Sequence, residues 1–162
     1  MISKSIKNAV IFGCEGPRLT EVEFNFFKET LPFGFILFSR NIVNAKQVNE
    51  LCQSLRDAVG WYAPILIDQE GGRVQRINPP LALDRLPPLD EAQKAGQNAK
   101  SIFKLRFSAM ANELLSLGID FNCAPVLDIA RPTTHRFLRN RCYGVNKSDV
   151  ISLGRVAYDA LK

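Results

Sequence analysis

The residues best able to do chemistry in this sequence lie in one segment, 64–76, which reads Pro-Ile-Leu-Ile-Asp-Gln-Glu-Gly-Gly-Arg-Val-Gln-Arg. A short apolar run ends there in two carboxylates, Asp68 and Glu70, a glycine pair and two arginines. A carboxylate accepts hydrogen bonds from two hydroxyls, whereas a planar guanidinium donates in a fixed orientation. This mixture of acceptors and donors favours a sugar site over a phosphate site.

Two further groups of polar residues follow apolar runs. One is Ser39-Arg40-Asn41, and the other is Asp128 with the polar loop 130–146. That loop contains several basic side chains: Arg131, His135, Arg136, Arg139 and Arg141. In a parallel barrel the carboxyl ends of the strands share one rim, so we expect all three groups around one site.

Structural roles compete with these functional ones. Gly71 and Gly72 could simply allow a tight turn, and Glu70 with Arg73 could form a local ion pair. Asp68 and Glu70 could also be read as a glycosidase carboxylate dyad. Alternate residues of a strand share a face, but that argument fails past the strand end, so the dyad is disfavoured.

The remaining candidates also have plain alternatives. Asp128 could cap the loop that follows it, and Arg76 alone could be a surface charge. His135, the one histidine, lies in a polar loop without the spacing of metal ligands, which favours a solvated role over a catalytic one.

The elements that must position these residues alternate between strand and helix patterns. Apolar runs predict strands, and apolar stripes with caps and glycine or proline stops predict helices. Four closely spaced prolines predict an irregular loop over 78–89. In chain order the predicted elements are strand 8–13, helix 20–30, strand 34–39, helix 44–59, strand 64–67, helix 95–117, strand 120–129 and a helix capped by Ser148.

This order gives four strand–helix units in an α/β chain. Four parallel strands ending on a helix are half of an eight-stranded (β/α)8 barrel. An open four-stranded sheet is the alternative, although neither G-x-G-x-x-G nor a phosphate loop marks a nucleotide binder.

Composition narrows the class of protein. The 162 residues carry a formal charge of +5 without a block of like charges, so a nucleic-acid partner is not indicated. No apolar run reaches the roughly 20 residues of a membrane helix, and the first residues lack a secretory core. Four dispersed cysteines predict reduced, mostly buried thiols in a cytoplasmic protein. A zinc site is not indicated, and neither is any cofactor.

Three segments resemble one known family. They are Gly-Phe-Ile-Leu-Phe-Ser-Arg-Asn at 34–41, Ile-Asp-Gln-Glu-Gly-Gly-Arg-Val-Gln-Arg at 67–76 and Ala-Pro-Val-Leu-Asp-Ile at 124–129. Together they resemble the family-three glycoside hydrolases, and within them the bacterial cytoplasmic β-N-acetylglucosaminidases (β-hexosaminidases) of peptidoglycan recycling.

The resemblance implies a TIM barrel, with residues 1–162 as the N-terminal half of its single domain. It also implies a retaining mechanism, with terminal β-linked N-acetylglucosamine of muropeptides as substrate. Asp68 and Arg76 would bind the sugar, and Arg141 would be a third ligand. The chain departs from the pattern around Arg141, because Arg139 replaces a usual glycine and Cys142 a usual serine or alanine.

The family's K-H-F-P-G-H-G segment, with its acid/base histidine, and its later aspartate nucleophile do not occur in these residues. Retaining hydrolysis needs both groups. The resemblance therefore predicts no catalytic residue within this chain and no activity from it alone. The alternative is a non-catalytic, sugar-binding or interaction protein that associates with itself through an exposed apolar face.

Overall fold

Parallel pairing of neighbouring strands organises the N-terminal part of the chain. The computed structural model describes residues 8–162, so the first residues, in which the sequence shows no secretory core, lie outside the described residues. The chain divides into two compact units, each described by itself below. One holds the residues up to Ile67 together with Leu114–Phe121, and the other holds Asp68–Glu113 and Asn122–Lys162.

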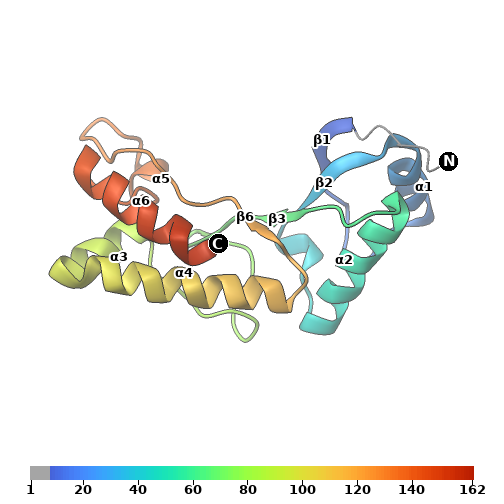
Figure 1. Ribbon diagram of the computed structural model, residues 1–162, viewed down its shortest axis with the longest axis horizontal. Helices are drawn as coiled ribbons and strands as arrows, with labels where there is room; N and C mark the ends of the chain where they lie inside the picture. Colours follow the sequence, from blue (N-terminus) through green and yellow to red (C-terminus); the bar gives the residue numbers. More distant parts are fainter. Residues whose placement is uncertain (1–7) are drawn as a thin grey trace. The chain divides into compact units, whose positions relative to one another are not determined.

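The first unit alternates strands and helices, as predicted (Figure 1). Its sheet has the order β1-β2-β3-β6, and β1 pairs with β2 and β2 with β3 in parallel. The chain therefore has an α/β fold with a parallel sheet. The elements are β1 (Asn8–Phe12), α1 (Glu21–Thr30), β2 (Pro32–Leu37), the 3-10 turn η1 (Ser39–Asn41), α2 (Ala45–Val59), β3 (Ile65–Ile67) and β6 (Phe121–Asn122), whose second residue belongs to the other unit.

Local signals set the ends of α1 and α2. The hydroxyl of Thr20 accepts from the Glu23 amide while the Glu23 carboxylate accepts from the Thr20 amide, so a complete capping box starts the predicted helix 20–30. Asn44 caps α2, and Gly60 ends that helix in the left-handed conformation at φ 71°. The sequence predicted these two helices because their signals lie within a few residues of each end.

Asp120 joins three parts of the first unit. Its carboxylate accepts hydrogen bonds from Arg56 Nη2 at 2.6 Å, the Tyr62 hydroxyl at 2.8 Å and the Ile65 amide at 3.0 Å. The Arg56 guanidinium also lies 4.0 Å from the Tyr62 ring centroid. These contacts connect α2 with the start of β3.

The second unit contains a small hairpin and four α-helices. These are β4 (Gln69–Gly71), β5 (Val74–Gln75), α3 (Pro88–Ala95), the 3-10 turn η2 (Gly96–Asn98), α4 (Ala99–Ser116, whose last turn belongs to the first unit), α5 (Arg136–Arg139) and α6 (Lys147–Leu161).

Three predictions for residues 78–148 were wrong in detail. The irregular loop ends before Pro88, which starts α3, because proline is well tolerated in the first turn of a helix. Asn146, not Ser148, caps α6 by accepting from the Asp149 amide. The predicted strand 120–129 is regular only at Phe121–Asn122, and the Ala124–Pro125 peptide bond beyond it is cis.

The predicted apolar stripe of α4 forms the core of the second unit. Phe103, Phe107 and Met110 are fully buried, and Tyr143 packs edge-on against Phe103 with ring centroids 5.1 Å apart. The burial of each of these large side chains contributes roughly 1.5–3 kcal/mol to the free energy of folding. The stripe therefore anchors the segment around Tyr143, which includes Arg141.

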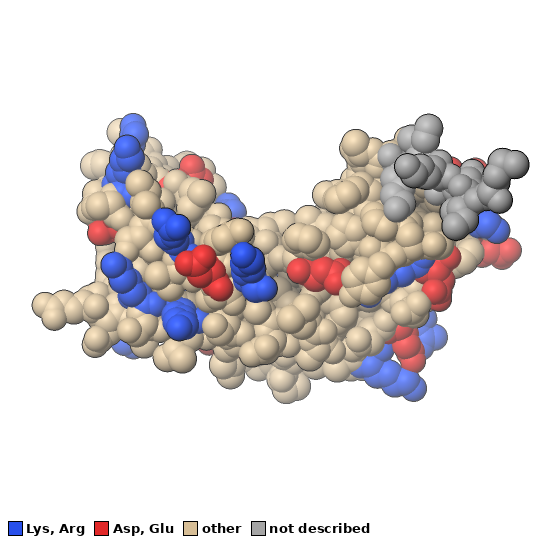
Figure 2. Space-filling model, in the orientation of Figure 1, with Lys and Arg blue, Asp and Glu red and all other residues tan. Residues whose placement is uncertain are grey.

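Charges are mixed on the surface. Figure 2 shows basic side chains on the visible face of the second unit with acidic ones among them, and no extended field of one sign. Within residues 8–162, no helix is long and apolar enough to cross a membrane.

Candidate functional site

A β-hairpin presents the polar segment that the sequence singled out. β4 and β5 pair antiparallel, with Gln69 opposite Gln75 and Gly71 opposite Val74. Gly71 and Gly72 have φ values of 97° and 60°, which side chains rarely tolerate. The glycine turn is thus confirmed, but the hairpin that it closes was not predicted, because its strands have only three and two residues.

Two amide side chains hold this hairpin in place. Asn122 accepts from the Gln69 amide at 3.0 Å and donates to the Gln69 carbonyl at 2.7 Å, as a neighbouring strand would. The Gln69 side chain in turn accepts from the amides of Arg76 and Ile77 and donates to the Ile77 carbonyl. The backbone between Asp68 and Arg76 is therefore fixed at both ends.

Asp68 and Arg76 form an ion pair at the base of the hairpin. Arg76 Nη2 donates to Asp68 Oδ2 at 3.0 Å, and each side chain keeps 27% of its surface exposed. Cys123 lies beside Asp68, and partial desolvation of the thiol together with that carboxylate raises the pKa of the thiol to about 11. Asp68 thus offers an accessible carboxylate whose orientation is held by a guanidinium.

Glu70 and Arg141 form a second, more buried pair. Arg141 donates from Nε to Oε2 at 2.9 Å and from Nη2 to Oε1 at 2.7 Å, a bidentate arrangement. The Glu70 side chain is 2% exposed, whereas that of Arg141 is 31% exposed. The hydrogen bonds to Glu70 raise the pKa of Arg141. Glu70 therefore positions Arg141 and is unavailable to a ligand.

The buried Arg106, on α4, forms hydrogen bonds with the backbone of the hairpin and of the following loop. Its Nη2 donates to the carbonyls of Glu70 and Leu86, and its Nη1 pairs with Glu91. Burial lowers the pKa of Arg106, against the raising effect of the Glu91 charge. A Cβ atom on Gly71 would lie 2.1 Å from Arg106 Nη2, so this contact requires glycine.

The loop that carries Arg141 accommodates both departures from the family pattern. The Arg139 guanidinium donates to the carbonyls of Ala130 at 3.5 Å and Arg131 at 2.6 Å, which ties the two sides of the loop together. The buried Cys142 thiol donates to the Leu138 carbonyl at 3.5 Å. Arg141 nevertheless pairs with Glu70.

The structure brings together Asp68, Arg76 and Arg141 in the second unit but gives other candidates different roles. Glu70 pairs with Arg141 rather than with Arg73, and its burial leaves no carboxylate dyad with Asp68. In the first unit Asn41 is fully buried and donates to the carbonyls of Cys14 and Gly16, which is a structural role.

The remaining candidates lie on the surface of the second unit. Asp128 is exposed and interacts electrostatically with Arg141. His135 is exposed, as expected, and its Nδ1 accepts from the Phe137 amide at 3.2 Å. Cys123 is exposed too, whereas Cys14, Cys52 and Cys142 are buried as predicted.

Sequence reasoning missed Gln69, Asn122 and Arg106. Gln69 and Arg106 are almost fully buried, and all three act through hydrogen bonds to the hairpin backbone. One signal was available for Arg106, since it lies three residues after Phe103 and so faces the same side of a helix as the apolar stripe. An arginine there must find buried partners.

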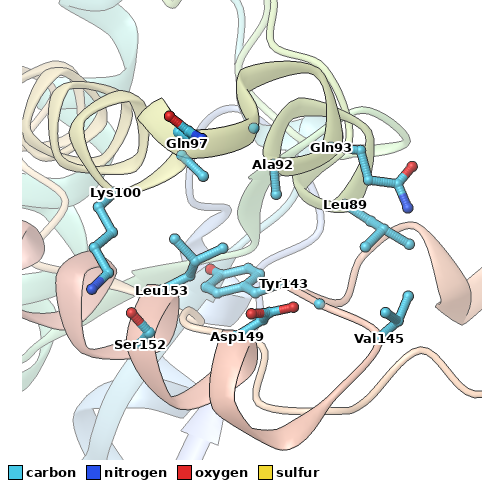
Figure 3. A pocket seen from close by; sticks show the side chains of 13 residues that line it. Leu89, Ala92, Gln93, Gln97, Lys100, Tyr143, Val145, Asp149, Ser152 and Leu153 are labelled. Atoms are coloured by element: carbon cyan, nitrogen blue, oxygen red, sulfur yellow. The ribbon is translucent and has the colours of Figure 1, made fainter.

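A cavity of about 450 Å³ lies elsewhere in the second unit, between α3, α4 and α6 (Figure 3). Figure 3 shows the Tyr143 ring in the middle of its lining, with Lys100 to one side and Gln93 to the other. Asp68, Arg76 and Arg141 do not line it. Among residues 8–162, no group of three potential ligands could hold a metal ion.

Comparison with known proteins gives a consistent picture. Residues 10–162 match the Glycosyl hydrolase family 3 N terminal domain. A beta-hexosaminidase of Haemophilus influenzae is 30% identical over 156 residues, which are 95% of this chain and 43% of that protein. One from Psychromonas ingrahamii is 31% identical, over 94% of this chain and 45% of that protein.

Solved structures with a similar fold come from the same family. NagZ from Neisseria gonorrhoeae in complex with N-trifluoroacetyl-D-glucosamine has a TM-score of 0.86 and 27% identity, over 96% of this chain and 46% of that chain. A glycoside hydrolase family 3 beta-N-acetylglucosaminidase from Paenibacillus has a TM-score of 0.81 and 26% identity, over 93% and 29%. This chain therefore spans less than half the length of each of these relatives.

Proposed function

This chain belongs to glycosyl hydrolase family 3, and on that premise we propose that it supplies the sugar-binding wall of a retaining β-N-acetylhexosaminidase. The substrate is terminal, non-reducing β-linked N-acetylglucosamine of peptidoglycan fragments. The beta-hexosaminidases at 30–31% identity and the sugar analogue in the NagZ complex support this choice.

The observation that carries the proposal is the pairing of each ligand residue with a partner that orients it. Asp68 accepts from Arg76 through Oδ2, and its side chain keeps 27% of its surface exposed, so the carboxylate can also accept from a sugar hydroxyl. Arg141 uses Nε and Nη2 for Glu70, so the N–H groups of Nη1 are directed elsewhere. A fixed carboxylate and two fixed guanidiniums suit a neutral polyol with several hydroxyls.

The architecture follows from the same premise. We infer that residues 1–162 form the N-terminal half of a single (β/α)8 TIM-barrel domain and contribute about four β/α units to it. The parallel pairing of β1, β2 and β3 and the likeness to NagZ support this inference.

The catalytic groups are proposed to lie outside these residues. A retaining glycosidase needs a nucleophile and an acid/base near the scissile bond. Glu70 is committed to Arg141, and the printed sequence contains no K-H-F-P-G-H-G segment. Residues 1–162 then bind the sugar but do not cleave it, and the cellular setting proposed for the whole enzyme is cytoplasmic peptidoglycan recycling.

Calorimetric titration with N-acetylglucosamine tests the proposal. We expect Asp68→Ala to weaken binding by roughly ten- to a hundredfold, because it removes charge-assisted hydrogen bonds. Asp84→Ala is the matched control, since Asp84 is an exposed carboxylate of the same unit. Equal affinity of the two variants would refute the role of Asp68.

Hydrolysis of a chromogenic β-N-acetylglucosaminide tests the second part. We expect no turnover by the 162-residue chain. Turnover at the rate of a full-length relative would show that a catalytic pair exists among these residues.

A second candidate function is supported by an apolar groove of about 500 Å³ in the second unit. It is lined by Leu127, Ile151 and Tyr158, which are 63%, 57% and 57% exposed, and by neighbouring side chains. Exposed apolar surface of this kind favours association. In this alternative the chain is a non-catalytic, sugar-binding or interaction protein that pairs with a second copy of itself.

A further inference from the structure

The cavity between α3, α4 and α6 is lined by polar side chains of both charges around an apolar base (Figure 3). Its volume of about 450 Å³ is within the range of sites for small ligands. All of its lining residues belong to the second unit, and Asp68, Arg76 and Arg141 are not among them. The cavity is therefore separate from the proposed sugar site.

One wall of the cavity comes from the segment that joins α3 to α4. Gln93, Gln97 and Lys100 are spaced by four and three residues, which places their side chains on one face of a helical segment. All three are exposed, and across the part of the chain that the structure describes their side chains form no hydrogen bond or ion pair. Two amides and one ammonium group are thus available to a ligand.

The opposite wall comes from the first turns of α6. Asp149 and Ser152 are three residues apart, a rise of about 4.5 Å along the helix axis. The exposed Asp149 carboxylate accepts from Asn146 Nδ2 at 2.7 Å. A Cβ on Gly144 would lie 2.5 Å from Asp149 Cβ, so the backbone before α6 packs directly on this residue. The carboxylate is therefore held in place at the cavity.

The base of the cavity is apolar and rigid. Leu89, Tyr143 and Leu153 line it and are 5%, 1% and 5% exposed. The Tyr143 ring packs edge-on against Phe103, on α4. A fixed apolar surface of this kind suits the aliphatic side chains of a ligand.

The two charges lie at different places along the cavity. In Figure 3, Lys100 is at one end, whereas Asp149 is nearer to the middle, beside the Tyr143 ring. Among the described residues, Lys100 and Asp149 do not form an ion pair with each other. A cation and an anion that do not neutralise each other are complementary to a zwitterion. Glutamine amides both donate and accept, so they can pair with a peptide group.

We propose that this cavity binds a short peptide with apolar side chains and two free ends. Lys100 binds the carboxylate of the peptide, and Asp149 binds its ammonium group. The glutamine amides pair with the peptide group between the two ends, and the apolar base contacts the side chains. The site goes beyond the proposed function and does not depend on it, because the two sites share no residue.

Nuclear magnetic resonance titration of the 162-residue chain with the dipeptide leucyl-leucine tests the site. We expect amide shifts in the segments 89–100 and 143–153. N-acetylation and C-terminal amidation of the dipeptide should each weaken binding about threefold, since each removes one charge, and both effects should shrink as salt rises. Equal affinity for the free and the doubly blocked dipeptide, or no shift in these segments, would overturn the proposal.

Two variants assign the ends of the peptide. Lys100→Gln should abolish the effect of amidation alone, and Asp149→Asn that of N-acetylation alone. Lys104→Gln and Asp159→Asn are the matched controls, since both residues are exposed, on α4 and α6, and do not line the cavity. The urea midpoint of each variant verifies that it is folded. An effect of amidation that persists in folded Lys100→Gln would contradict the proposed orientation and the role of Lys100.

Discussion

Glu70 and Arg141 form the contact on which the geometry of the candidate site depends. Glu70 is almost fully buried, while Arg141 is partly exposed and keeps N–H groups beyond those that Glu70 accepts. In the proposed site, Glu70 therefore supplies the orientation and Arg141 the contact to the sugar. Glu70 acts through Arg141 and is therefore a positioning residue.

Glu70→Gln should weaken sugar binding about tenfold and lower the free energy of unfolding by roughly 1–3 kcal/mol, because the amide cannot accept both hydrogen bonds from Arg141. Urea unfolding and calorimetric titration measure the two effects. Glu50→Gln is the control, since Glu50 forms an exposed ion pair with Lys46 on α2 and its replacement should change neither quantity measurably. Unchanged sugar affinity in Glu70→Gln would contradict the positioning role.

For single residues, the sequence predicted which side chains belong to the candidate site better than it predicted which side chains pair with one another. Asp68, Arg76 and Arg141 were singled out, and the structure places all three in the second unit. The partner of Glu70 was not predictable, because Arg141 lies 71 positions away while Arg73 is a near neighbour in sequence. Long-range pairing depends on the whole fold.

The hairpin β4–β5 is the element that joins the site residues, and its turn packs tightly against other parts of the second unit. A Cβ on Gly71 would meet Arg106 Nη2 at 2.1 Å and the Leu86 carbonyl at 2.9 Å. The hairpin cannot move away easily, since Asn122 and Gln69 fix its backbone. Close packing and positive φ therefore act together at one residue.

Gly71→Ala should lower the free energy of unfolding by roughly 2–4 kcal/mol, the sum of an unfavourable φ and a steric clash. Gly60→Ala is the matched control. Gly60 also has a positive φ, but nothing lies within 4 Å of its added Cβ, so only the conformational cost of about 1 kcal/mol applies. Equal destabilisation of the two variants in urea would show that the contact with Arg106 is loose.

The capping box of α1 predicts a dependence on pH. Burial opposes ionisation of Glu23, but hydrogen bonds from the Thr20 and Glu15 amides outweigh it and lower the pKa of the carboxyl. A group with a lowered pKa stabilises the fold above its unfolded pKa, and this stabilisation is lost as pH falls through the folded value.

The urea midpoint should therefore fall on acidification below about pH 4.5 by more in the unmodified chain than in Glu23→Gln, which has no proton to gain at this position. Glu21→Gln is the control, since Glu21 is an exposed carboxylate two residues earlier in the same first turn, and this variant should follow the unmodified chain. Parallel curves for the unmodified chain and Glu23→Gln would contradict the role of the carboxylate.

Elements with local signals were predicted well, and the others were not. Helix α2 begins at the residue after Asn44 and ends at Val59, close to the predicted range, because its cap and its stop are both in the sequence. The hairpin and the short strand β6 have too few residues to show a period. Asn122 holds β6 to Gln69 with its side chain, which no periodicity reveals.

At the scale of the whole molecule, the sequence predicted an α/β chain with a parallel sheet, and the pairings of β1, β2 and β3 confirm it. The four expected strands are present in the sheet order, although β6 is much shorter than the predicted strand 120–129. The pattern of apolar residues could not predict that β6 ends at Asn122, because the end of the strand depends on the backbone geometry of the residues that follow.

The apolar groove on α6 predicts association between copies of the chain. We expect sedimentation equilibrium to show dimers at micromolar concentration, and Ile151→Glu to shift the population toward monomer, since a charge in this groove is costly to bury. Val22→Glu is the control, because Val22 is a comparably exposed apolar residue on α1. A monomer at all concentrations would argue against the self-association candidate.

The long separation between Glu70 and Arg141 also has a consequence for biosynthesis. The pair Asp68–Arg76 can form within a contiguous stretch as soon as the hairpin has left the ribosome. Arg141 emerges 71 residues after Glu70, and until then the buried carboxylate has no counter-charge from that loop. The proposed sugar site therefore cannot be complete until Arg141 has been synthesised, and a nascent chain that is released before Arg141 would carry the motif of residues 67–76 without its third proposed sugar ligand.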